Sequence, residues 1–294
     1  MDIKVAINAR AICGESPTWA EANRCLYWID VKKPALHRSN LSSGQSDSWL
    51  MPSHIGAFAL IADNTGAVIA LRTGIFLLAF SSGSLRPLSP APFDAKQFRF
   101  NDGVCDSVGR LWLGVMSEPL AGNAAPLTSP IYSFTRSHGL IATAEEYAVP
   151  NGFALSADES EYYISDSHEG KIYRYGFDIA SGMLGEAECF ATVSPVIGVP
   201  DGAAIDADGG YWVALHCAGL LRRYLPSGGI DLDIRLPVSK PTMCAFGGRN
   251  LETLFITTST ENMSKSALAA EPMAGSVLFC RPGVRGIERH HIVR

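Results

Sequence analysis

The feature that most constrains the fold is a pattern of paired strands that recurs six times along the chain. Each copy has an apolar run, a turn rich in Asp, Asn or Gly, and a second apolar run, as in a β-hairpin. Successive copies start roughly 40–50 residues apart, the period of four-stranded propeller blades. The copies are SPTWAEANRCLYWID from Ser16, AFALIADNTGAVIAL from Ala57, DGVCDSVGRLWLGVM from Asp102, NGFALSADESEYYISDS from Asn151, DGAAIDADGGYWVALH from Asp201 and PTMCAFGGRNLETLFIT from Pro241.

A sheet built from one copy cannot bury both of its faces, whereas blades packed around a ring bury both and protect their edges. We therefore predict an all-β, six-bladed β-propeller, with residues 1–294 as a single domain; a ring of five or seven blades is the structural alternative. We expect Ile3–Ile7 to add a strand to the last blade and close the ring. Further expected strands are Ile75–Phe80, Ile131–Thr135, Ile172–Phe177, Leu220–Tyr224 and Val277–Cys280.

The longest irregular segment is Glu118–Pro130, EPLAGNAAPLTSP. Its Gly, Pro and Ala content argues against a strand. A surface loop is the default interpretation, and a partial lid over the channel is the functional one, because long loops on such scaffolds carry function.

Charge and composition limit the partners. The net charge is −5 and the chain has no long basic run, so neither a nucleic acid nor an anionic membrane is expected to bind. The start of the chain lacks the pattern of a secretory signal, and no run approaches the ~18 apolar residues of a membrane helix. Seven cysteines without a CxxC pair are typical of free, buried thiols in a reducing cytoplasm. We expect a cytoplasmic monomer or weak homodimer.

Polar residues recur at the start of four of the six expected innermost strands, those of blades one, three, four and five, beside the central channel. They are Glu15, Asn101 with Asp102, Asn151, and Asp201. Any one of them alone is a common turn former. Glu15, Asn151 and Asp201 together offer two carboxylates and an amide oxygen, a set that suits Ca²⁺, Mg²⁺ or Mn²⁺. Zn²⁺ is an alternative, but no histidine or cysteine recurs at these positions.

These motifs also carry a resemblance. The chain resembles the SMP-30/gluconolactonase/luciferin-regenerating-enzyme family nearly end to end, and each piece is weak without the others. The matching pieces are GESPTW at Gly14–Trp19, LYWID at Leu26–Asp30, RFNDG at Arg99–Gly103, RLWLGVM at Arg110–Met116, PNGFALSAD at Pro150–Asp158, GVPDG at Gly198–Gly202 and PTMCAFGG at Pro241–Gly248.

The resemblance implies a six-bladed propeller with a divalent metal ion in its channel, Ca²⁺ first, that hydrolyses an aldonolactone such as glucono-, arabino-, xylono- or galactonolactone. It makes Glu15, Asn151 and Asp201 the metal ligands and Asp201 also the general base. Arg99 and Asn101 would hold the substrate, with Glu118 as a further contact. One departure is Ser16, where many relatives have glycine, and it bears on substrate choice rather than on chemistry.

Other functions remain as alternatives. A catalytically silent calcium-binding or sugar-sensing propeller needs the same ligands but neither a base nor a substrate-binding pair. A metal-dependent esterase or phosphotriesterase would use the same centre on another substrate. The chain has no GxSxG, GxGxxG or HExxH motif, so a serine-triad hydrolase, a nucleotide cofactor and a zincin site are not indicated.

Overall fold

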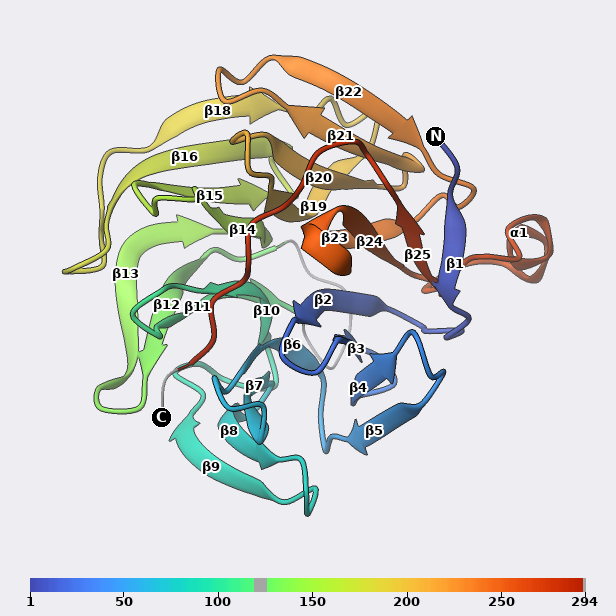
Figure 1. The fold of residues 1–294 in the computed structure, drawn as a ribbon. Helices are drawn as coiled ribbons and strands as arrows, with labels where there is room; N and C mark the ends of the chain where they lie inside the picture. The colour runs from blue at the N-terminus through green and yellow to red at the C-terminus, as the bar shows by residue number, and fades with distance from the viewer. Residues whose placement is uncertain (119–125, 293–294) are drawn as a thin grey trace.

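The computed structural model describes residues 1–118 and 126–292 and shows a ring of blades around a central axis (Figure 1). In this part of the chain there are six sheets, five of four strands and one of five. The prediction of a six-bladed β-propeller is therefore confirmed. Blade one comprises β2 (Gly14–Ala20), β3 (Cys25–Asp30), β4 (Ala35–Asn40) and β5 (Ser46–Leu50), and blade two comprises β6 (Ile55–Leu60), β7 (Gly66–Leu71), β8 (Gly74–Ala79) and β9 (Leu85–Pro90).

The next three blades repeat this up-and-down order, with a small extra strand, β17, in blade four. Blade three comprises β10 (Phe98–Cys105), β11 (Leu111–Ser117), β12 (Ser129–Thr135) and β13 (Gly139–Tyr147). Blade four comprises β14 (Pro150–Leu155), β15 (Glu161–Asp166), β16 (Lys171–Asp178), β17 (Met183–Leu184) and β18 (Glu188–Thr192). Blade five comprises β19 (Val199–Ile205), β20 (Tyr211–His216), β21 (Leu220–Tyr224) and β22 (Ile230–Arg235).

Blade six joins the two ends of the chain. It contains β23 (Pro241–Gly247), β24 (Thr253–Thr258) and β25 (Val277–Cys280), and the N-terminal β1 (Lys4–Ile7) pairs antiparallel with β25. The predicted closure of the ring by the N-terminal run is thus confirmed. Helix in the described residues is limited to η1 (Arg249–Leu251) and α1 (Lys265–Ala270), and neither is long or apolar enough to cross a bilayer.

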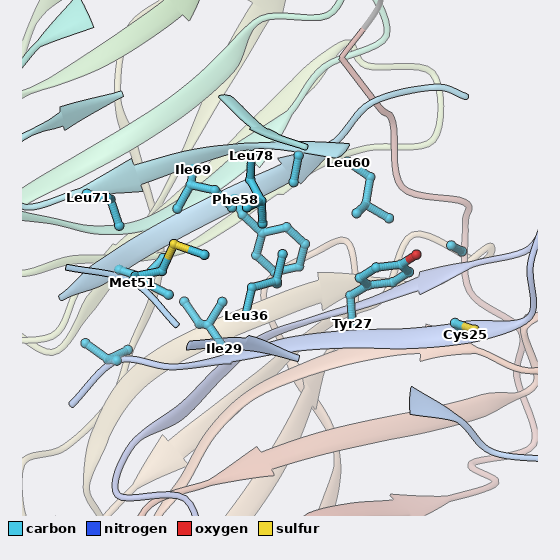
Figure 2. Close-up of a cluster of buried hydrophobic side chains, with 14 residues drawn as sticks. Cys25, Tyr27, Ile29, Leu36, Met51, Phe58, Leu60, Ile69, Leu71 and Leu78 are labelled. Carbon is cyan, nitrogen blue, oxygen red and sulfur yellow. The ribbon is translucent and has the colours of Figure 1, made fainter. Parts of the chain in front are cut away.

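The core lies between the blades. Figure 2 shows the cluster between blades one and two, where Tyr27, Ile29 and Leu36 face Phe58 and Ile69. These side chains are at most 6% exposed, and dispersion contacts across such dry interfaces hold neighbouring blades together. Trp28, Trp112 and Trp212, which lie on the second strands of blades one, three and five, are all buried.

A turn carboxylate fixes the tryptophan in blades three and five. Asp106 Oδ2 accepts the indole N–H of Trp112 at 2.9 Å, and Asp206 Oδ2 accepts that of Trp212 at 2.7 Å. Both aspartates are fully buried, and an Arg side chain completes each network, because a buried carboxylate needs such partners. The D-x5-W spacing, which occurs at Asp106–Trp112 and Asp206–Trp212, therefore has a structural role and not a catalytic one.

Residues 281–292, here called the C-terminal strap, cross the face of the ring on which the innermost strands end (Figure 1). The strap contacts four blades: Gly286 with Leu251, Arg285 with Ala207, His290 with Glu159, and Ile292 with Leu60 and Ala62. Arg289 lies beneath the channel, where burial lowers the pKa of its guanidinium in spite of the nearby Asp102 carboxylate. The strap therefore links the blades in addition to the pairing of β1 with β25. The sequence patterns did not predict it.

Two expectations were wrong in part. Ser129 and Pro130 begin β12 instead of ending a loop, because proline is accommodated near the start of a strand. Residues 119–125 of the expected lid lie outside the described residues, so the lid remains a prediction. All seven cysteines are free, but Cys189 and Cys217 are exposed, since they lie on an outer strand and in a turn where no neighbouring blade covers them.

Candidate metal and substrate site at the channel mouth

A β-bulge at the start of each innermost strand creates the candidate site. The pairing register shifts in all six described innermost strands, for example between Glu15 and Thr18 in blade one, Phe100 and Gly103 in blade three, and Pro200 and Ala203 in blade five. A bulge bends the strand and re-aims side chains. The polar residues that recur in the sequence lie at these bulges, which explains why they precede or adjoin glycine or a residue with positive φ such as Ser16 (φ 50°).

Glu15 and Asp201 lie beside the channel close enough to interact. Burial raises the pKa of the Glu15 carboxyl well above its usual range, and the charges of Asp201 and Asp102 raise it further. Burial likewise raises the pKa of Asp201, followed by the charge of Asp102. Three acidic groups thus share a desolvated region in which each disfavours the ionised form of the others.

Hydrogen bonds fix the amide side chains between these carboxylates. Asn101 Nδ2 donates to Asn151 Oδ1 at 2.8 Å, and Asn151 Nδ2 donates to Ser167 Oγ at 2.8 Å. Ser167 Oγ in turn donates to the Pro200 carbonyl at 2.6 Å, next to Asp201. The network runs from blade three to blade five and determines which way the Asn151 carbonyl oxygen points.

Asp102 fastens two blades. Its Oδ1 accepts the Gly103 N–H at 2.7 Å, and its Oδ2 accepts the Phe153 N–H of blade four at 3.2 Å. Burial raises the pKa of the Asp102 carboxyl in spite of these hydrogen bonds. The side chain therefore supports the arrangement of the bulges, in keeping with an orienting role.

Arg99 connects the network to Glu118. Arg99 Nη1 donates to Asn101 Oδ1 at 2.7 Å and to the Phe100 carbonyl at 3.0 Å, while its Nε lies 3.1 Å from Glu118 Oε1. Asp102 is not its ion-pair partner; that role falls to Glu118. The structure thus brings Arg99, Asn101 and Asn151 together in one hydrogen-bonded series with Glu118 at its end.

Glu118 has more cationic neighbours than the sequence indicated. Its carboxylate contacts Lys32 Nζ at 2.5 Å, His54 Nδ1 at 3.1 Å and the guanidinium of Arg72. Burial raises the pKa of Glu118, but His54, Arg99 and Lys32 outweigh it, so the group stays ionised at any ordinary pH. Lys32, His54 and Arg72 were missed in the sequence. Arg72 directly follows the second strand of blade two, as Glu118 does in blade three, and Lys32 comes two residues after the second strand of blade one.

The donor set fits a hard divalent cation. Glu15, Asp201 and the Asn151 amide offer hard oxygen atoms, and a divalent cation bound there would stabilise the ionised form of both carboxylates. Residues 1–118 and 126–292 contain no group of three His, Cys, Asp or Glu side chains arranged to hold a metal ion; the candidate set has an asparagine, Asn151, as its third ligand. Cys13 lies nearby, but burial and the charges of Glu15 and Asp201 raise the pKa of its thiol, so it stays protonated.

Comparison with known proteins agrees with this description. Residues 13–260 match the model of the SMP-30/Gluconolactonase/LRE-like region. Over 287 residues, 97% of this chain and 96% of the relative, the sequence is 36% identical to the 6-deoxy-6-sulfogluconolactonase of Pseudomonas putida. Human regucalcin is 29% identical over 278 residues, 94% of this chain and 93% of that protein.

Solved structures show the same fold. The calcium-binding protein regucalcin from Agrobacterium tumefaciens superposes with a TM-score of 0.89 at 26% identity, covering 98% of this chain and 96% of the other. A luciferin-regenerating enzyme gives a TM-score of 0.89 at 23% identity over the full length of both chains, which bears on the fold alone. The chain is a six-bladed propeller with a polar channel mouth. It belongs to the SMP-30/gluconolactonase/LRE-like family.

Proposed function

We propose that the protein hydrolyses the lactone of a sugar acid at the channel mouth, with one divalent metal ion held by Glu15, Asn151 and Asp201. The observation that carries this proposal is the pair of desolvated carboxylates beside an oriented amide oxygen and a hydrogen-bonded Arg99. Ca²⁺ is the first candidate, because the ligands are hard oxygens and the A. tumefaciens relative is described as calcium-binding. Mg²⁺, Mn²⁺ and Zn²⁺ are the alternatives.

A bound divalent ion would polarise the lactone carbonyl and increase the acidity of a water molecule. We assign the role of general base to Asp201, because a carboxylate oxygen that does not coordinate the ion can accept the proton of the attacking water. The water oxygen bonds to the carbonyl carbon, its proton goes to the Asp201 carboxylate, and the ring C–O bond breaks. The ring oxygen leaves as a hydroxyl group after taking up a proton, and the product is the aldonic acid.

Arg99 and Asn101 hold the sugar. The planar guanidinium of Arg99 can donate to ring hydroxyls or ring oxygen, and the amide of Asn101 can both donate and accept. Glu118 keeps Arg99 in place and is the further candidate contact. Gluconolactone, arabinolactone, xylonolactone and galactonolactone are the substrates to compare, together with the sulfonated lactone that the P. putida relative is named for.

The test is hydrolysis by purified, chelator-treated protein, followed by acid release, with each metal ion added back separately. Turnover that returns with a metal ion supports the proposal. Asp201→Asn should retain measurable metal binding and lose most turnover, while Asp208→Asn, an exposed carboxylate on the opposite face, should behave as the wild type. An unchanged rate in Asp201→Asn would exclude that residue as the base.

A non-catalytic calcium-binding protein is the second candidate, because the same ligands serve it and relatives at 27–30% identity are regucalcins. Metal binding by calorimetry without turnover of any lactone or ester would favour it. Turnover of phosphotriesters or simple esters above that of lactones would instead favour a related metal-dependent esterase.

A further inference from the structure

The geometry of the ring gathers cationic side chains at the channel mouth. Each innermost strand begins at this mouth and the second strand of the same blade returns to it, so residues that follow second strands surround the opening. Blade by blade, these and the adjacent linker residues include Lys32 and His54, Arg72, Arg99 with Glu118, and Lys240 with Glu261; we call this set the mouth cluster.

The mouth cluster has more positive than negative charge once Glu15 and Asp201 are counted with the divalent ion of the proposed function, and Asp102 with the nearby Arg289. Lys32, Arg72, Arg99 and Lys240 are four permanent cations, against the carboxylates of Glu118 and Glu261. Lys240 Nζ donates to the Glu261 backbone carbonyl at 2.6 Å and leaves that carboxylate to Lys32, 3.3 Å away. This surplus occurs in a chain with a net charge of −5.

The surplus exceeds what is needed to hold Glu118. Arg72 is buried and donates to the Ala95 carbonyl, the Glu118 carbonyl and the Glu118 carboxylate. Arg72 alone therefore neutralises and anchors Glu118. With Lys32 counted against Glu261, 3.3 Å away, two positive charges remain in the cluster, and the entropy and desolvation needed to place them there favour a further anionic partner.

Unused hydrogen-bond donors identify where such a partner would bind. Arg99 is 8% exposed, and its Nε is buried against Glu118 Oε1, 3.1 Å away, which holds the guanidinium at the edge of the cluster. Lys32 Nζ has three donors and two carboxylate neighbours, and its side chain is 20% exposed. The Lys32 amide donates to Asp30 Oδ1 at 3.1 Å, which fixes the turn that carries the side chain.

We infer that the mouth cluster selects lactones that carry an acidic substituent, a carboxylate, sulfonate or phosphate, at the end of the sugar remote from the reacting carbonyl, with Lys32 as the specificity-determining residue. This inference rests on the proposed lactonase function. Arg99 joins the rest of the cluster, through Glu118, to the Asn101–Asn151 pair, so an anion held by Lys32 and Arg99 leaves the lactone carbonyl within the polar site. Oxyanions accept charge-assisted hydrogen bonds from both side chains.

The test compares kcat/KM for neutral gluconolactone with the same lactone bearing a 6-carboxylate, a 6-sulfonate or a 6-phosphate. At low ionic strength we expect at least one acidic lactone to exceed the neutral one by about tenfold, and we expect added NaCl to reduce the difference. The ranking among the three acidic lactones identifies the substituent. Equal or faster turnover of the neutral lactone overturns the inference and leaves the lactonase proposal intact.

Variants assign the effect to Lys32. Lys32→Gln should lower kcat/KM for the preferred acidic lactone by about tenfold, chiefly through KM, and change the neutral lactone by less than about threefold. Lys32→Arg should retain the preference. Lys33→Gln, the exposed neighbour, should match the wild type. If Lys32→Gln affects neutral and acidic lactones alike, Lys32 is structural and the inference is wrong; if no lactone is hydrolysed, the proposed function fails and the inference fails with it.

Discussion

Ser167 offers a test of how the candidate site is oriented, because it touches Asn151 without being a candidate ligand. Its hydroxyl accepts from Asn151 Nδ2 at 2.8 Å and donates to the Pro200 carbonyl at 2.6 Å. Ser167→Ala removes both hydrogen bonds and leaves the buried Asn151 amide free to rotate. The Asn151 carbonyl oxygen would then spend less time directed at the channel.

The expected magnitude follows from the groups left unpaired. A buried donor that loses its partner costs about 1–3 kcal/mol, which corresponds to about 5- to 150-fold in an equilibrium constant. Asn101 still donates to Asn151 Oδ1 in the variant, so part of the orientation survives. We therefore expect Ca²⁺ binding to weaken by about tenfold, at the lower end of the range for residues that orient metal ligands.

Isothermal titration calorimetry of chelator-treated protein with Ca²⁺ measures this effect. Ser165→Ala is the matched control, because Ser165 lies on β15 two residues before Ser167, pairs with Asn151 across the ladder and is fully buried, but its hydroxyl has no hydrogen-bond partner among the described residues. Removing that hydroxyl should change the dissociation constant by less than about twofold. Equal losses in the two variants, or no loss in Ser167→Ala, would refute the orientation argument.

Two further predictions concern stability and thiol chemistry. Asp206→Ala should lower the free energy of unfolding by about 3–5 kcal/mol, because it removes the buried carboxylate shared by Arg223, Trp212 and the Gly210 amide and leaves Arg223 only the more exposed Asp231 among the described carboxylates, whereas the exposed Asp208→Ala should stay within about 0.5 kcal/mol. Burial raises the pKa of Asp206, but hydrogen bonds from Arg223 and Trp212 outweigh it and the net shift is downward. Its contribution is therefore present above the unfolded-state pKa of about 3.9 and lost as pH falls through the folded-state pKa, so urea midpoints of wild type and Asp206→Ala should converge below about pH 4; a constant difference would contradict this. In native protein, Ellman's reagent should titrate the two exposed thiols, Cys189 and Cys217, before the four buried ones, and a Cys189→Ser, Cys217→Ser double variant that still reacts as fast would disprove the assignment.

The fold could be predicted because its signal is repeated. A strand–turn–strand pattern recurring at one period determines the blade and the blade count, and even the strands Leu220–Tyr224 and Val277–Cys280 have the predicted bounds. The two-residue β17 and the six-residue α1 could not be predicted in this way, since each occurs once and is too short to show periodicity. The strap was missed for the same reason: it has no repeat, and its contacts link residues distant in sequence.

In the candidate site too, the residues that belong to the repeat could be predicted and the others could not. Glu15, Asn151 and Asp201 share one structural position, the bulge of an innermost strand, so the repeat exposes them. The cations around Glu118 have no common motif. His54 precedes a first strand, while Lys32 follows a second strand in another blade, and their convergence depends on the closure of the ring. Ser167 was likewise hidden, because a serine after a strand carries no signal until its partner is known.

The path of the strap has a practical consequence for handling the protein. Ile292, hydrogen-bonded to Leu60 and Ala62, lies on the face of the ring opposite Glu15, Asn151 and Asp201. A support, a fluorophore or a fusion partner attached beyond residue 294 would therefore be held on the far side from the channel mouth. Protein immobilised through this end should have its channel mouth directed toward the solution. Substrate could then reach the site without passing the support.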